Sequence, residues 1–174
     1  MQGTAAGRRR GAACAAAYMH MKTVKESVST LSQVMLPGDA NPAGTVHGGE
    51  IMKIMDTCGG VAATRHARRT VVTVRVDELR FYHPIYVGEL LICESKIVFA
   101  GHTSMEAEVI VRVDNLTDED PVRTALKAYF TYVALDDDRA PCAVPKLKPE
   151  TDEEKAAFET RRQKYLARKQ GRAN

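Results

Sequence analysis

The stretch from Gly48 to Ala67 constrains the fold more than any other part of this chain. Apolar residues such as Ile51, Met55 and Ala62 occupy most of its positions, so it predicts a helix with no clear polar face. A helix of this kind is normally buried on all sides. We therefore expect the rest of the domain to wrap around it.

One carboxylate, Asp56, lies in the middle of this predicted helix. A buried carboxylate without a partner is costly, so we expect Asp56 to be paired, neutralised or functional. Residues 37–47 are rich in Gly, Pro, Asp and Asn and predict a loop before the helix. This loop brings Asn41, His47 and the pair Gly48 and Gly49 to the helix N-terminus, where backbone N–H groups lack helical partners.

Alternating apolar and polar residues predict strands on both sides of the helix. The runs are 24–36 before it and 71–81, 89–99, 104–113 and 124–135 after it. Within 71–81, this alternation puts Val72 and its apolar neighbours on one face and Thr73, Arg75 and Asp77 on the other. Short turns between the strands indicate an antiparallel sheet with one covered face, and hence an α+β fold with the sheet wrapped around one helix. The open edges of such a sheet favour pairing with a second copy.

We expect three parts along the chain: a disordered basic extension at 1–23, one domain at 24–136, and a C-terminal loop and charged helical tail at 137–174. The extension has no acidic residue, but its apolar stretch is too short for a signal peptide, so a translation start at Met19 or Met21 is the simpler reading. In the tail, Thr151 and Glu154 have the spacing of a capping box. Its few apolar residues predict only light packing against the domain.

The composition excludes several classes of protein. The formal charge of +3 is too small to indicate nucleic-acid binding, and no apolar run approaches the roughly 20 residues of a membrane span. The four cysteines are scattered, without the paired spacing of a zinc site or a disulfide framework. We therefore expect a cytoplasmic protein with free thiols, no metal, and neither a nucleic-acid nor a membrane partner.

Several motifs of this chain resemble those of the hotdog-fold acyl-CoA thioester hydrolases, the family of the brain-type long-chain enzyme and its small single-domain bacterial relatives. They are PGDANPAGTVHGGEIMKIMD at 37–56, RH at 65–66, VVTVRVD at 71–77, PIYVGE at 84–89 and GHTSM at 101–105. The resemblance covers roughly 24–135, and both ends of the chain lie outside it.

The resemblance implies a hotdog domain that hydrolyses acyl-CoA to free acid and CoA. It also implies active sites shared within a homodimer, often in a homohexamer of three dimers. Asn41 and Asp56 match the two catalytic residues of the family. Asp56 would activate water or attack the thioester itself, and Asn41 would hold the water or the carbonyl oxygen. The substrate is already an activated thioester, so we expect no cofactor besides the CoA that it carries.

Further residues are candidates for positioning the substrate. His47, Gly48 and Gly49 open the helix, where backbone N–H groups and the helix dipole favour a developing oxyanion. We read His47 as a positioning residue rather than a catalytic one. Arg65, Gly101, Thr103 and Ser104 are candidates for contacting CoA, and Arg68 and Arg69 are further cations for its phosphates.

Two other functions remain open at the level of sequence. One is a sensor that binds acyl-CoA without catalysis, although residues 1–23 are too few for a helix-turn-helix domain. The other is a hydratase or dehydratase of the same fold, in which His47 rather than Asp56 is essential. Motifs of dinucleotide enzymes, P-loop proteins, serine hydrolases and zinc peptidases are absent from the sequence.

Overall fold

The computed structural model describes residues 21–171, and within them the predicted α+β fold is confirmed. The main elements are β2 (Ser29–Val34), α2 (Gly48–Ala67), β3 (Thr70–Phe81), β4 (Leu90–Ala100), β5 (Ser104–Asp114), β6 (Arg123–Leu135) and α3 (Asp152–Gln170). Two short 3-10 helices, Lys25–Ser27 and Pro37–Asp39, flank β2, and two three-residue strands, β1 (Met21–Thr23) and β7 (Lys146–Lys148), complete the set. The predicted bounds of the central helix are confirmed.

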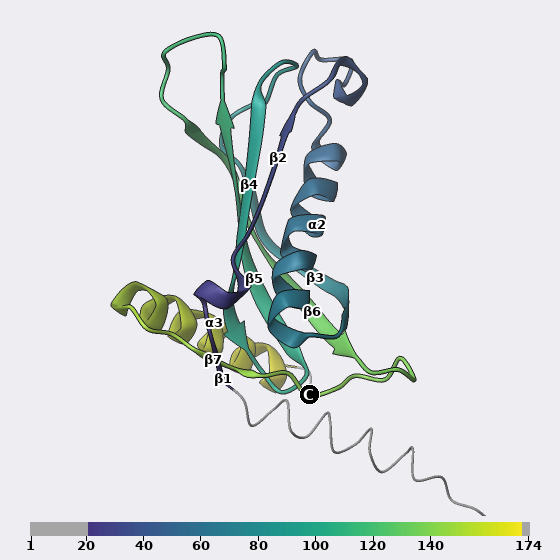
Figure 1. The fold of residues 1–174 in the computed structure, drawn as a ribbon, viewed down its shortest axis with the longest axis vertical. Coiled ribbons are helices and arrows are strands. Elements are labelled where there is room, and N and C mark those ends of the chain that lie inside the picture. Colours follow the sequence, from purple (N-terminus) through teal and green to yellow (C-terminus); the bar gives the residue numbers. More distant parts are fainter. Residues whose placement is uncertain (1–20, 172–174) are drawn as a thin grey trace, which may run out of the picture.

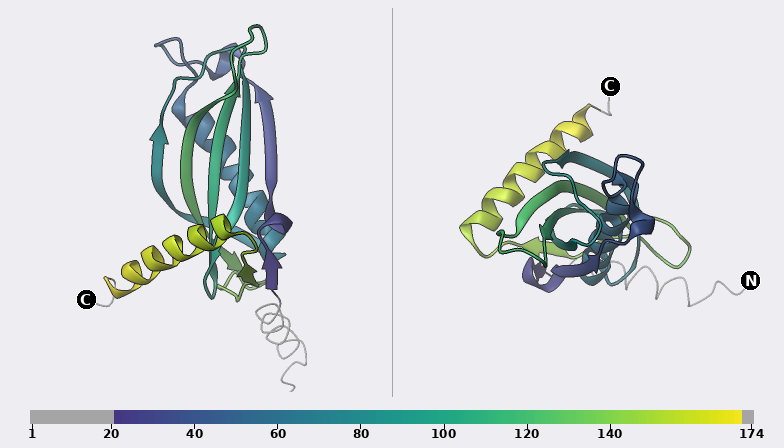
Figure 2. Two further views of the ribbon diagram at one scale, coloured as in Figure 1. Left: turned by 90° about the vertical axis from the view of Figure 1, so that its left-hand side faces the viewer. Right: turned by 90° about the horizontal axis from the view of Figure 1, so that it is seen from above.

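The five long strands form one antiparallel sheet in the order β2-β4-β5-β6-β3. Helix α2 lies along one face of this sheet, and the C-terminal helix α3 crosses the opposite face near one end (Figures 1 and 2). The buried side of α2 packs against alternate residues from Met105 to Val113 and from Leu126 to Tyr132, as their alternation predicted. Three described cysteines, Cys58, Cys93 and Cys142, are buried and form no disulfide.

The expectation that α2 is buried all round is wrong for the single chain. The helix buries one side, including Ile51, Met55 and Cys58, but Lys53 and Asp56 on its other side are exposed. A five-stranded sheet covers only one side of a helix, so the remaining side is left to solvent or to another molecule. Asp56 is therefore not a buried carboxylate in this chain.

The first expected strand, 24–36, is also different in the structure. Its beginning is a 3-10 helix, Lys25–Ser27, and only Ser29–Val34 joins the sheet. Residues 21–23, which the sequence places in the N-terminal extension, form β1 and pair in parallel with β7. Residues 1–20 of that extension lie outside the described residues.

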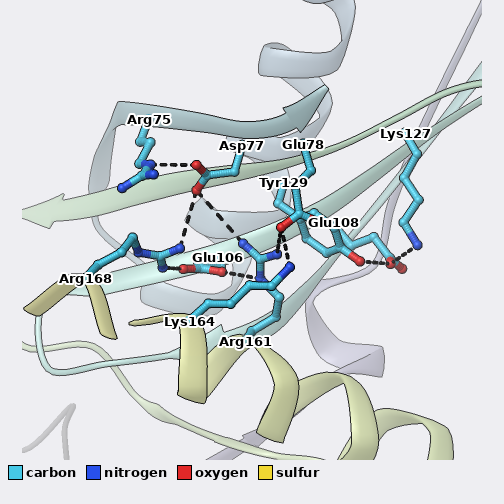
Figure 3. Close-up of polar contacts among 10 residues, drawn as sticks. All are labelled: Arg75, Asp77, Glu78, Glu106, Glu108, Lys127, Tyr129, Arg161, Lys164 and Arg168. Atoms are coloured by element: carbon cyan, nitrogen blue, oxygen red, sulfur yellow. Dashed lines mark hydrogen bonds and ion pairs between the residues drawn. The ribbon is translucent and has the colours of Figure 1, made fainter. Parts of the chain in front are cut away.

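The expectation of light packing by the C-terminal helix is wrong. Its predicted capping box, Thr151 with Glu154, is confirmed, but its inner face carries a buried arginine, Arg161, which is 2% exposed. The Arg161 Nε donates to Glu106 of β5 at 2.6 Å, and its Nη1 donates to Glu78 of β3 at 3.0 Å (Figure 3). Its guanidinium also lies 4.0 Å from the centroid of the Tyr129 ring.

Further ion pairs join α3 to the same face of the sheet. Lys164 also binds Glu78, and Arg168 binds Glu106 and Asp77 (Figure 3). The hydrogen bond from Lys164 lowers the pKa of the Glu78 carboxyl. Phe99 of β4 packs against Phe158 and Tyr165 of the helix. Helix α3 is thus fixed to the sheet by charged and aromatic contacts together.

A β-bulge between Thr73 and Arg75 overturns the predicted faces of β3. An extra residue in one strand reverses the alternation beyond it. Thr73 therefore points toward α2, whereas Asp77 points toward α3 on the opposite face. Sequence alternation alone put both side chains on one face.

The buried His66 near the end of α2 gives the fold an expected pH dependence. Its Nε2 lies 2.8 Å from the carbonyl oxygen of Pro145, and burial lowers the pKa of its imidazole below the ordinary value of 6.5. The unfolded chain then binds more protons than the folded chain below pH 6.5, so the free energy of unfolding decreases as the pH falls through that window.

We expect His66→Gln to reduce this pH dependence, which one proton limits to about 1.4 kcal/mol per pH unit. Urea unfolding at pH 7.5, 6.5 and 5.5 measures this change of the free energy of unfolding with pH. The control is His83→Gln, a change at an exposed histidine. An unchanged pH slope in the His66 variant would contradict the assignment.

Candidate active site

Asp56 lies on the exposed side of α2, next to the edge strand β3. Its Oδ1 accepts a hydrogen bond from the Thr73 hydroxyl at 2.5 Å and a longer one from the Tyr132 hydroxyl at 3.3 Å. Tyr132 also donates to the backbone carbonyl of Asp56 at 2.9 Å. Within the described part of the chain, Oδ2 accepts no hydrogen bond. One carboxylate oxygen is therefore held in place, and the other is open.

The register of the sheet brings the two hydroxyls together. Thr73 of β3 pairs directly with Tyr132 of β6, so their side chains lie side by side on the face that α2 covers. Gly59 leaves room for the Tyr132 ring, because a Cβ at that position would collide with the tyrosine hydroxyl. Burial, and next the charge of Asp56, raise the pKa of the Tyr132 phenol, so this group stays protonated and donates.

A pocket of about 430 Å³ opens beside Asp56. The carboxylate shares this pocket with Thr73 and Tyr132, and the remaining walls come from α2 and the start of β3. Of the predicted CoA-binding residues, Arg65 lines the same pocket. Its Nη1 also donates to the backbone carbonyl of Val28. The pocket thus contains both a carboxylate, Asp56, that can accept a proton and a cation, Arg65.

Asn41 lies in the loop before α2, and its amide is used within that loop. Its Oδ1 accepts from the backbone N–H of Ala43 at 2.8 Å, and its Nδ2 donates to the Thr45 hydroxyl at 2.9 Å. Asp56 lies eight residues into α2, about 12 Å along the helix axis from its first residue. The structure does not bring Asn41 and Asp56 of one chain into contact.

The helix N-terminus is capped by His47. Its Nδ1 accepts a hydrogen bond from the Gly49 N–H at 2.9 Å, which occupies one of the two amides that we expected to be open. The Gly48 N–H has no partner within the described residues, and the Phe81 ring lies over Gly48. His47 in this chain is a helix cap.

The remaining predicted CoA-binding residues lie elsewhere. Thr103 and Ser104 line a separate hollow of about 410 Å³, which Tyr165, Arg168 and Lys169 of α3 also line and Asp56 does not. A Cβ added to Gly101 would lie 3.4 Å from the Tyr165 ring of α3. The structure therefore does not bring Gly101, Thr103 and Ser104 together with Asp56 in a single chain.

Sequence reasoning missed Thr73, Tyr132 and Gly59. Tyr132 lies in the alternating run 124–135 and carries no motif of its own, but a buried tyrosine usually needs a partner for its hydroxyl, and that was the available signal. Nothing in the alternation of β3 indicated that Thr73 faces the helix, because the bulge is invisible in sequence.

Among residues 21–171, no group of three or more His, Cys, Asp or Glu side chains is arranged to hold a metal ion, and no helix is long and apolar enough to cross a bilayer.

Comparison with known proteins places this chain in a family. Residues 43–119 match the family model of the thioesterase superfamily. The chain is 39% identical over 153 residues to the cytosolic acyl coenzyme A thioester hydrolase of Rattus norvegicus, covering 86% of this chain and 40% of that protein. It thus spans about two fifths of the length of that relative. It is also 36% identical over 118 residues to an acyl-CoA thioester hydrolase of Escherichia coli, covering 89% of the relative and 66% of this chain.

Solved structures give the same result. The acyl-CoA hydrolase of Staphylococcus aureus, solved with butyryl coenzyme A and coenzyme A, has a TM-score of 0.79 at 35% identity, covering 88% of this chain and 93% of that one. A hexameric acyl-CoA thioesterase solved without ligand has a TM-score of 0.82 at 32% identity, covering 88% of this chain and 98% of that one. The chain therefore belongs to the thioesterase superfamily, among its hotdog-fold acyl-CoA thioester hydrolases.

Proposed function

We propose that this protein hydrolyses acyl-CoA thioesters to the free acid and CoA. The observation that carries the proposal is the environment of Asp56, whose carboxylate has one oxygen held by Thr73 and Tyr132 and the other open to a pocket. Solved structures of the Staphylococcus aureus hydrolase include alanine mutants of an asparagine, of an aspartate fifteen residues further on and of a threonine seventeen residues after that. Asn41, Asp56 and Thr73 have the same residue types at the same spacing.

In this mechanism, Asp56 acts as a general base. Its free Oδ2 takes a proton from water, and the water oxygen attacks the thioester carbonyl carbon. The resulting tetrahedral intermediate collapses as the C–S bond breaks, and the CoA thiolate leaves and takes up a proton. In the second route, Oδ2 attacks the carbonyl carbon directly, the CoA thiolate leaves and takes up a proton, and water then hydrolyses the mixed anhydride to the free acid and the Asp56 carboxylate. Either route uses an oxygen that no other group of the described chain occupies, and neither needs a metal or a cofactor.

The proposed active unit is a dimer joined along β3. This strand is twelve residues long, lies at the edge of the sheet, and exposes Val72, Val74 and Val76. Long apolar edge strands favour pairing with another chain. A second copy placed there covers the exposed side of α2 and removes water from the Asp56 pocket. Three such dimers can associate further into a hexamer, and two of the similar solved structures are hexameric.

The dimer also gives Asn41 a role. Two antiparallel copies of β3 bring the N-terminal end of one α2 toward the middle of the other, so Asn41 of the partner subunit can reach the Asp56 pocket. Its Nδ2 has a second N–H beyond the one that binds Thr45, and this N–H can hold the thioester carbonyl. The Gly48 amide is a further donor for the oxyanion at the same helix end. His47 supports this end as a cap.

Release of free thiol from acyl-CoAs of increasing chain length tests the proposal. We expect the wild-type protein to release CoA and to show its chain preference as a maximum of kcat/KM along the series. Saturable binding of an acyl-CoA without release at any chain length would contradict the proposal and favour a sensor. Hydration of an enoyl-CoA without thioester cleavage would favour the hydratase.

A further inference from the structure

Tyr132 is the least expected member of the Asp56 site, because a phenylalanine would fill the same space in the core without a polar atom. Its side chain is 1% exposed, and its ring centroid lies 6.2 Å from that of Phe130. We propose that Tyr132 is a positioning residue for the hydrolysis and that Gly59 is the feature of α2 that admits it. The inference rests on the proposed function and adds a residue that acts through Asp56 rather than on the substrate.

The tyrosine hydroxyl contacts two oxygens of a single residue. It lies 2.9 Å from the backbone carbonyl oxygen of Asp56 and 3.3 Å from its Oδ1. The carbonyl of a residue in the middle of an α-helix already accepts the N–H four residues later, so the helix does not need this second donor. The hydroxyl instead bridges the main chain and the carboxylate of Asp56, which restricts the rotation of that side chain.

Thr73 supplies a second fixed point for the same carboxylate. Its hydroxyl donates to Oδ1 at 2.5 Å from β3, whereas Tyr132 approaches from β6. Two donors from two strands fix the orientation of the carboxylate plane more closely than one donor does. Because both of them bind Oδ1, Oδ2 is the oxygen that remains available toward the pocket that Asp56 lines.

Gly59 gives an independent argument. It lies in the middle of α2, where glycine is less favourable than alanine. A Cβ at this position would collide with the Tyr132 hydroxyl oxygen, whereas a Cβ at Gly60 would lie 3.8 Å from the same ring, in ordinary contact. The closest approach to Gly59 is thus made by the hydroxyl, the group that a phenylalanine lacks.

A purely structural role explains less of this arrangement. The Tyr132 hydroxyl has to be removed from water on folding, and a glycine within a helix lowers the stability of the folded chain relative to alanine. Both unfavourable features occur at one point of the fold, directly beside the candidate catalytic carboxylate. Departures from locally favourable choices are expected at functional sites.

Tyr132→Phe tests the inference, because it removes only the hydroxyl. We expect kcat for an acyl-CoA to fall about 10-fold with KM little changed, since a less well placed base slows the reaction without weakening substrate binding. The acid limb of the pH profile of kcat should move to higher pH, because a carboxylate with one donor fewer is protonated more readily. Arg65, the other charged side chain that lines this pocket, is the same in both proteins.

Tyr129→Phe is the matched control. Tyr129 lies on the same strand but faces α3, where its ring contacts the guanidinium of Arg161. Its hydroxyl also donates to a carboxylate, that of Glu108, at 3.1 Å. This variant therefore loses a hydroxyl and a hydrogen bond of the same kind, and it should leave kcat and its pH profile unchanged.

Gly59→Ala should reproduce the effect of Tyr132→Phe, because the added methyl group displaces the hydroxyl. In the double variant the hydroxyl is already absent, so the alanine should lower kcat little further. Additive losses in the double variant would overturn the role of Gly59.

Full kcat with an unchanged pH profile in Tyr132→Phe would overturn the inference. So would a fall in kcat that only follows the loss of folded protein, measured by circular dichroism, with the pH profile unchanged. A wild-type protein that cleaves no acyl-CoA contradicts the proposed function instead, so the two failures are distinguishable.

Discussion

Asp56→Asn is expected to lower kcat by about 10³-fold or more, because an amide cannot accept the proton of the attacking water or attack the thioester as a nucleophile. The change keeps the size of the side chain and its place beside Thr73 and Tyr132. Far-UV circular dichroism and light scattering should therefore match the wild type. A variant that is folded and assembled but retains full activity would contradict the role of Asp56.

Mixing this variant with Asn41→Ala tests whether each site takes residues from two chains. In a dimer of one Asp56→Asn chain and one Asn41→Ala chain, one of the two shared sites is made of wild-type residues only. Random co-assembly of the two inactive proteins should therefore restore about one quarter of the wild-type rate. If both residues act within one chain, no mixture contains an intact site and no activity returns.

The mixing experiment needs chains that exchange, so the two variants are best co-expressed with the same tag in equal amounts and purified together without selecting the mixed assemblies. Assemblies of each variant alone, purified in the same way, are the matched controls. Recovery of activity in the mixture alone supports the shared site along β3. Activity in a monomeric fraction would contradict it.

The second large effect is expected from Arg161→Ala, which should lower the free energy of unfolding by about 3 to 5 kcal/mol. Arg161 and Glu106 are both 2% exposed at their side chains and lie 2.6 Å apart. Removing the guanidinium leaves the Glu106 carboxylate buried with one partner fewer, and it removes the cation that stacks on Tyr129. Removing one partner of a buried ion pair lowers the free energy of unfolding much more than replacing both partners by uncharged residues.

The neighbouring residue provides the control. Arg162 is exposed, and among residues 21–171 its ion pair is with Glu159 of the same helix, so Arg162→Ala should change stability by less than about 1 kcal/mol. The double variant Arg161→Met with Glu106→Gln, which removes both charges, should be more stable than Arg161→Ala. Urea unfolding followed by circular dichroism measures all three. Equal losses for Arg161→Ala and Arg162→Ala would show that the buried cluster does not fix α3.

The two large predictions concern opposite faces of one strand. Because of its bulge, β3 presents Thr73 to Asp56 on one face and Asp77 to the arginines of α3 on the other. Helix α3 therefore fixes β3 in place. Thr73 of that strand in turn positions Asp56, the candidate catalytic carboxylate.

The sequence by itself determined the parts of this protein that depend on local periodicity. The bounds of α2, the inward residues of β5 and the capping box of α3 follow from spacings of a few residues, and the structure confirms them. The family also followed from sequence, since its motifs are contiguous. Asn41 and Asp56 as catalytic residues stay predictions, because they come from matched positions and neither is tested by the fold.

Only the tertiary structure decided which surfaces meet. Asp56 is exposed because the sheet covers one side of α2, and its two hydroxyl partners are a cross-strand pair that only the register of β3 and β6 brings together. The bulge that turns Thr73 inward and the contact of Gly59 with Tyr132 likewise depend on long-range packing. Contacts between strands that are distant in the sequence leave no periodic signal in one sequence, because each strand has the same pattern whichever strand it pairs with.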